Sequence, residues 1–172
     1  MADNKTDQNG AQAAAGNGQE AQPASFALQR IYLKDSSFES PRSPAVFQGK
    51  WEPKITFNLN TKNAKVGEGL YEVVLLVNVE AKVDDNSAFL VEVQQAGIFS
   101  ATGLGDADLE HVLAAVCPNI LFPYARETID SLVVKGSFPP INLAPVNFDA
   151  LFAQSKKRQA EEADKAAPEA TN

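Results

Sequence analysis

The sequence predicts an α+β fold built on a four-stranded antiparallel sheet, and three observations support that prediction. Two long segments, Leu70–Val83 and Ser87–Phe99, are rich in β-branched residues and are separated only by Asp84, Asp85 and Asn86. Two further strand-like segments precede this pair, and helical patterns occur only after it. Because strands and helices do not alternate along the chain, a parallel sheet of β-α-β units is not indicated.

The two long segments predict a hairpin with one inward and one outward face. Side chains alternate between the faces of a strand, so a turn centred on Asp85 decides which residues lie opposite each other. The inward face pairs Val79 with Val91, Val77 with Val93 and Leu75 with Gln95, beside Tyr71, Val73 and Phe89. The outward face carries Glu72, Val74, Leu76, Asn78, Glu80, Leu90, Glu92 and Gln94. This mixture of aliphatic residues and carboxylates fits a half-buried face or a protein-docking surface equally well.

The first two strands lie before the hairpin. Phe26–Asp35 is predicted as strand one, and its imperfect alternation is typical of a strand that is covered on both sides or lies at a subunit edge. After it, 36–51 contains two prolines and predicts a long irregular crossover. Ile55, Phe57 and Leu59 then alternate with polar residues and predict strand two, one face of which is buried. The following segment, Thr61 to Gly69, is predicted as a polar turn that leads into the hairpin.

Three helical patterns follow the strands. Asp106 is expected to cap a first helix that Pro118 interrupts, and a second helix is expected over 119–135 with Gly136 as a left-handed stop. Residues 137–145 contain three prolines and predict an extended segment, which we call the proline-rich strip. Asn147 is expected to cap a last helix with the apolar stripe Phe148, Leu151 and Phe152.

Composition assigns the folded domain to residues 26–155. The segment 1–25 has hardly an aliphatic residue longer than alanine, and 156–172 is rich in alanine and charge without apolar periodicity, so both are expected to be disordered tails. The chain shows neither a secretory signal nor the roughly 20 apolar residues that span a bilayer. We therefore expect a cytoplasmic protein that does not insert into membranes.

Charge is unevenly distributed and bears on the class of partner. The net charge is −7, and residues 68–110 alone hold nine carboxylates against a single base, Lys82. Phosphate backbones bind clustered lysine and arginine, so this distribution disfavours nucleic acid as a partner. It fits a basic protein partner, although acidity that serves only solubility fits as well.

No catalytic or metal-binding arrangement emerges from the sequence. His111 is the only histidine, which disfavours a metal site even though Asp108 and Glu110 are near it in the chain. The single cysteine, Cys117, excludes an internal disulfide, has no family signature around it and is expected to be a packed thiol. Gly103-Leu-Gly105 lacks the third glycine of a dinucleotide-binding loop. We expect neither an enzyme nor a bound cofactor or metal.

Large apolar residues in irregular segments predict a peptide-binding groove. The crossover and the proline-rich strip are expected to flank a groove. The sheet is expected to form the base of this groove and the last helix one of its walls. The residues expected to line it are Phe47, Trp51, Phe57, Leu59, Phe138, Ile141 and Leu143. Ordinary core packing is the alternative for these side chains, and truncation to alanine should distinguish the two because a packed core aromatic costs far more stability.

Several blocks of the chain resemble the bacterial protein-export chaperone SecB. They are Phe26-x-Leu-Gln-Arg-Ile-Tyr-x-Lys-Asp35, Leu90-x-Glu-Val-Gln-Gln95, Gly97-Ile-Phe99, Cys117-Pro-Asn-Ile-Leu-Phe-Pro-Tyr-Ala-Arg-Glu127 and Asn142-Leu-Ala-Pro-Val-Asn-Phe-Asp-Ala-Leu-Phe152. The resemblance covers Phe26 to Phe152, and the tails match nothing. It implies a four-stranded antiparallel sheet with helices on one side, assembled as a homotetramer that is a dimer of dimers.

The resemblance also implies a function and a set of residues. SecB-like proteins hold unfolded precursor polypeptides without ATP and deliver them to the motor protein SecA. The positions that match the family's SecA-binding surface are Asp35, Glu39, Leu90 and Glu92, and those that match its oligomer-supporting residues are Val91, Val93 and Gln95. Val91 replaces a cysteine of some members and keeps the apolar character of the position. The alternative is a SecB-like chaperone dedicated to one intracellular client, such as a toxin–antitoxin system.

Overall fold

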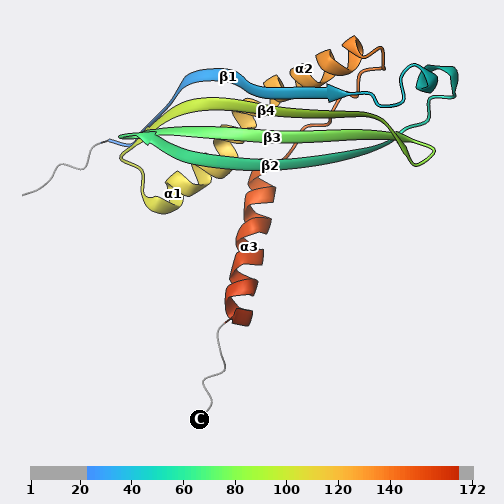
Figure 1. The fold of residues 1–172 in the computed structure, drawn as a ribbon. Coiled ribbons are helices and arrows are strands. Elements are labelled where there is room, and N and C mark those ends of the chain that lie inside the picture. Colours follow the sequence, from blue (N-terminus) through green and yellow to red (C-terminus); the bar gives the residue numbers. More distant parts are fainter. Residues whose placement is uncertain (1–22, 167–172) are drawn as a thin grey trace, which may run out of the picture.

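The computed structural model describes residues 23–166, and it contains a single four-stranded antiparallel sheet within them. The strands are β1 (Ser25–Glu39), β2 (Lys54–Gly67), β3 (Leu70–Val83) and β4 (Asn86–Thr102), in the spatial order β1-β4-β3-β2. Helix α2 (Cys117–Lys135) lies across one face of this sheet, and the other face carries no helix among the described residues (Figure 1). The predicted fold class is therefore confirmed.

The central hairpin has the predicted register. Leu75 pairs with Gln95, Val77 with Val93 and Val79 with Val91. These six side chains are at most 3% exposed because helix α2 covers the inward face. Together with Phe89, Phe99, Leu121 and Ile129 they form the core between the sheet and the helix.

Both outer strands are longer than predicted. Strand β1 continues through Glu39, so the crossover begins four residues later than expected, and it contains a short 3-10 helix, Ala45–Gln48. The prediction of a polar turn over Thr61–Gly69 was wrong, since β2 pairs with β3 as far as Gly67 and only Glu68 and Gly69 make the turn. Polar residues are tolerated there because β2 is an edge strand that exposes much of its surface.

The first two helices form one continuous helical run. Helix α1 (Asp106–His111) leads through the π-helical segment Val112–Val116 into α2, and Pro118 is the second residue of α2. A proline lacks the backbone donor and crowds the carbonyl one turn earlier, and the wider π-helical turn lies where that conflict arises. Pro118 therefore changes the winding without ending the helix, and Asp106 makes no side-chain cap.

Gly136 ends α2 for a reason other than the predicted one. Its φ of −75° is not left-handed, and Ser137 takes the positive φ of 66° instead. A Cβ on Gly136 would lie 2.2 Å from Cζ of Phe38, so the glycine is required for the close approach of β1 to the end of α2.

We expect Gly136→Ala to lower the free energy of unfolding by about 1–3 kcal/mol, because the ring of Phe38 would have to move out of its packed position. Gly49→Ala is the matched control, since a Cβ there has nothing within 4 Å. Urea unfolding at a fixed protein concentration measures both. Equal stability of the two variants would contradict the steric explanation.

The last helix, α3 (Phe148–Ala166), projects away from the body of the protomer (Figure 1). The predicted cap is confirmed, since the backbone N–H of Ala150 donates to Asn147 Oδ1 at 2.9 Å. The structure carries helix through Ala166, whereas the sequence predicted disorder from residue 156. Its charged residues from Lys156 to Asp164 are exposed, which explains why no apolar periodicity revealed this part of the helix. The predicted tail 1–25 lies almost entirely outside the described residues.

Candidate functional site

The face of the sheet opposite the helices gathers the four residues predicted to bind SecA. Leu90 and Glu92 point outward from β4, as the alternation predicted. On the neighbouring strand, Glu39 pairs with Leu90 and Asp35 pairs with Gln94, so both acidic residues lie on the same outward face. Three of the four are exposed and Leu90 is partly buried. We call this set, Asp35, Glu39, Leu90 and Glu92, the acidic face.

Ion pairs accompany this outward surface. Glu80, opposite Leu90 on β3, lies 3.3 Å from Lys82 Nζ, and both side chains are partly exposed. Lys34 Nζ contacts Glu72. The potential over the outward face is therefore set by the carboxylates of the acidic face and of Glu80, with lysines placed beside individual acids.

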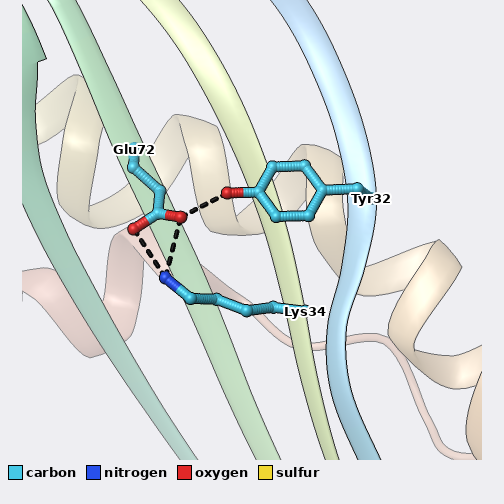
Figure 2. Close-up of polar contacts among 3 residues, drawn as sticks. All are labelled: Tyr32, Lys34 and Glu72. Carbon is cyan, nitrogen blue, oxygen red and sulfur yellow. Dashed lines mark hydrogen bonds and ion pairs between the residues drawn. The ribbon is translucent and has the colours of Figure 1, made fainter.

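A polar cluster that the sequence did not reveal crosses the same face. Tyr32 and Lys34 of β1 reach over β4 to Glu72 of β3, and Figure 2 shows both side chains converging on the one carboxylate. Lys34 Nζ donates to both oxygens of Glu72 at 2.8 Å, and Tyr32 Oη donates to Oε1. The three residues are 38 and 40 positions apart in the chain, so no local sequence signal could have found them.

These hydrogen bonds set the protonation of the cluster. Donation to Glu72 raises the pKa of Tyr32 to about 12, with burial and the nearby negative charge acting in the same direction. Hydrogen bonds from Lys34 and then from Tyr32 hold the pKa of Glu72 below its usual value. The carboxylate is therefore charged and the phenol neutral at neutral pH. Stability from Glu72 is lost as pH falls through its lowered pKa, and stability from Tyr32 is lost as pH rises toward 12.

On the helix side of the sheet, the crossover and the proline-rich strip meet in an aromatic cluster. The ring centroids of Phe47 and Trp51 each lie 5.2 Å from that of Phe138, which also contacts Phe89 at 4.9 Å and Phe38 at 6.3 Å. Phe47 is 48% exposed and Trp51 is partly buried, but Phe138 is only 5% exposed. Four other rings enclose Phe138, so its side chain is buried in the protomer, which favours core packing, the alternative to a place in the groove.

The remaining residues predicted for the groove are partly buried against the core. Phe57 and Leu59 lie on the inward face of β2, opposite Val79 and Val77. Ile141 and Leu143 belong to the strip, which is fixed to α2 by hydrogen bonds. The backbone N–H groups of Ile141 and Asn142 donate to Asp130 Oδ1 at 2.9 and 3.2 Å, and Arg126 donates to the carbonyl of Leu143 at 3.4 Å.

Two adjoining hollows lie between β2, the helical run and the root of α3. One, of about 400 Å³, is lined by Leu59, Asn60, Thr61, Ala114, Phe148, Leu151, Phe152, Ser155 and Arg158. The other, of about 370 Å³, shares Ala114, Phe152 and Ser155 with it. Leu59 is the predicted groove residue that lines this space. The last helix was expected to form a wall of the groove, and the apolar stripe of α3 lines this hollow with Phe148, Phe152 and Leu151, which is 43% exposed.

The three residues predicted to support the oligomer are buried inside the protomer. Val91, Val93 and Gln95 are 0%, 1% and 3% exposed. Gln95 Nε2 donates to the backbone carbonyl of Tyr32 at 2.9 Å and so ties β4 to β1. Any influence of these residues on association must therefore act through the shape of the sheet and not by direct contact.

The lone histidine and cysteine have structural surroundings. His111 Nε2 lies 2.7 Å from Asp149 Oδ1, which joins α1 to the start of α3. Burial raises the pKa of Cys117 to about 12 and confirms it as a packed thiol. Among residues 23–166, no three histidine, cysteine or acidic side chains are grouped as a metal site would require. No helix in that range is long and apolar enough to cross a membrane.

Comparison with known proteins gives one consistent family. A family model described as preprotein translocase subunit SecB matches residues 18–159. Protein-export protein SecB of Hahella chejuensis is 60% identical over 143 residues, which cover 83% of this chain and 89% of the relative. Protein-export protein SecB of Marinobacter nauticus is 56% identical over 152 residues, which cover 88% and 92% respectively.

A solved structure supports the fold. The Mycobacterium tuberculosis SecB-like chaperone Rv1957, in complex with a ChAD peptide from the Rv1956 HigA1 antitoxin, aligns with a TM-score of 0.54 at 17% identity. The alignment covers 70% of this chain and 87% of that one. At this level of identity the similarity concerns the arrangement of the sheet and helices.

Proposed function

Because this chain belongs to the SecB family and is a chaperone for protein export, we propose that it holds unfolded precursor polypeptides without ATP and delivers them to SecA. Delivery to SecA is supported above all by the register of β1 and β4. This register places four residues on one face of the sheet: Asp35, Glu39, Leu90 and Glu92. A surface rich in carboxylates attracts a basic partner and speeds its association. The chaperone would act in the cytoplasm, without a catalytic site, cofactor or membrane insertion.

Clients would bind on the helix side of the sheet, so a client and SecA would not compete for the same surface. The hollows beside the root of α3 are lined by apolar side chains such as Leu151 and Phe152 together with polar ones, and the exposed ring of Phe47 and the partly buried ring of Trp51 offer further anchoring area. The edge of β2 next to the hollows is free within the described residues, and a free edge can pair with an extended peptide. Phe57, Leu59, Ile141 and Leu143 would complete this groove.

The chain would assemble as a homotetramer, a dimer of dimers. Strand β1 is the other edge of the sheet, and three large apolar side chains on it are well exposed in the single protomer. Phe26 is 36% exposed, Leu28 is 43% exposed and Leu33 is 47% exposed. Exposed apolar residues along an edge strand are the usual mark of an interface. Relatives named for protein export, at 56–60% identity, do not favour a chaperone dedicated to one client.

The proposed function is tested with the purified full chain. We expect a tetramer by light scattering, suppression of aggregation of an unfolded secretory precursor without nucleotide, and binding to SecA in calorimetry. Because the acidic face is exposed and its attraction is screened by salt, the affinity for SecA should fall as the salt concentration rises from 50 to 500 mM. Precursor holding, which rests on apolar contact, should not weaken with salt. A protein that does not bind SecA at 50 mM salt would contradict the delivery step.

A further inference from the structure

The acidic face depends on an irregularity in strand β1. Tyr32 pairs with Ala96 on the outward face and Leu33 pairs with Gln95 on the inward face. Lys34 has no partner, and the pairing resumes with Asp35 opposite Gln94. This single extra residue reverses the alternation for the rest of the strand.

The reversal decides which side chains reach the outward face. With strict alternation from Tyr32, the acids Asp35 and Glu39 would point inward and Phe38 would point outward. In the structure, Asp35 and Glu39 point outward, and Phe38 pairs with Val91 and joins the aromatic cluster. Two of the four residues of the acidic face are therefore placed there by the extra residue.

The polar cluster surrounds this irregularity. Lys34 is the extra residue itself, and its ammonium group is held by both oxygens of Glu72. Tyr32, two residues earlier, donates to the same carboxylate on the outward side and accepts from Gln95 Nε2 through its backbone carbonyl on the inward side. The strand is thus fixed where the alternation changes, to β3 by the contacts with Glu72 that Figure 2 shows and to β4 by Gln95.

We propose that Tyr32, Lys34 and Glu72 act as a brace that holds the extra residue of β1 in place and thereby positions Asp35 and Glu39 for SecA. This inference rests on the proposed function of the acidic face. The three residues are positioning residues and need not touch SecA. Phe38 anchors the far end of the segment, so loss of the brace frees Lys34 to Ser37 and displaces Asp35 more than Glu39.

Reversing the charge of Lys34 tests the brace, because loss of the brace predicts a lower affinity for SecA whereas electrostatic attraction alone predicts a higher one. Lys34→Glu makes the outward face more acidic, which by attraction alone would strengthen binding of a basic partner. It also places two carboxylates against each other, and we expect a three- to tenfold loss of affinity for SecA. Glu72→Lys should lose at least as much. The swap K34E/E72K restores both the ion pair and the net charge, and it should bind SecA within twofold of the wild type.

Lys62→Glu is the matched control. Lys62 is exposed on the same outward face, opposite Val74 on β3, and lines the same hollow as Lys34 and Glu72, while the hydrogen bonds to the Glu72 carboxylate come from Lys34 and Tyr32. It undergoes the same charge change as Lys34→Glu, and we expect unchanged or tighter binding of SecA. If Lys34→Glu fails to fold, Lys34→Met should lose affinity while Lys34→Arg, which keeps the charge and the donors, should stay within twofold.

Two direct readouts report on the brace itself. Absorbance titration should show one of the three tyrosines ionising near pH 12, and this transition should move toward pH 10 in Glu72→Gln. Backbone amide shifts of 34–37 should change in Lys34→Glu and return in the swap.

The brace is overturned if Lys34→Glu behaves as Lys62→Glu does or if the swap restores neither affinity nor the amide shifts. Failure of the docking assignment is a different result, in which Glu92→Lys keeps full affinity for SecA. In that case the positioning role for SecA is overturned with it, whatever the amide shifts show.

Discussion

Replacing Glu92 with lysine is expected to lower the affinity for SecA by about tenfold or more while binding of unfolded precursor stays within twofold. Glu92 is exposed on the outward face of β4, next to β1, which carries Asp35 and Glu39 of the acidic face. The substitution changes the local charge by two units, and a like charge opposite a basic partner opposes both encounter and docking. Tenfold corresponds to about 1.4 kcal/mol. Calorimetry at low salt with SecA, and aggregation assays with the precursor, measure the two affinities.

Glu127→Lys is the control for this variant. Glu127 is exposed on α2, which covers the opposite side of the sheet, and it undergoes the same change of charge. We expect its affinity for SecA to remain close to that of the wild type. A similar loss in both variants would mean that SecA senses the net charge of the protomer, and full affinity in Glu92→Lys would refute the assignment of the acidic face.

Replacing Phe138 with alanine is expected to lower the free energy of unfolding by about 3–5 kcal/mol, the usual cost of truncating a packed aromatic residue. Phe138 is 5% exposed and its ring contacts Phe38, Phe47, Trp51 and Phe89. Truncation would remove the centre of the aromatic cluster and leave a cavity that these rings cannot fill without moving. Urea unfolding at a fixed protein concentration measures the loss.

Phe47→Ala is the matched comparison, because Phe47 touches the same ring but is 48% exposed. It should lose less than half as much stability as Phe138→Ala. Its affinity for unfolded precursor should fall, since exposed aromatic rings commonly anchor a bound chain. A stable Phe138→Ala variant with weakened precursor binding would instead return Phe138 to the client groove.

The central hairpin could be predicted from sequence because its information is local. Only Asp84 and Asp85 separate the two strands, so the turn fixes the register and alternation then assigns every side chain to a face. Glu92 and Leu90 were placed on the outward face in this way, and the structure confirms them there. The cap at Asn147 was equally local, because it depends on a residue three positions away.

Strand β1 could not be predicted to the same degree. Its alternation is interrupted twice, between Leu28 and Arg30 and between Leu33 and Asp35. From sequence, the pattern indicated a strand covered on both sides or at a subunit edge, and the structure shows an edge strand with two extra residues. Where such a residue is accommodated depends on the partner strand and on distant side chains such as Glu72, which local propensity does not contain.

Sequence by itself determined the sheet class, the inward row of the hairpin and the family, since each depends on patterns that lie within a few residues or on matched blocks of chain. Tertiary structure alone decided the surroundings of Phe138 and Gly136 and the formation of the polar cluster. Phe138 became core because four rings from other segments enclose it, and Gly136 was required because Phe38 approaches it. The physical reason is common to these cases. Burial, steric exclusion and a shared carboxylate are properties of contacts between segments far apart in the chain, and they exist only once the sheet and helices have packed together.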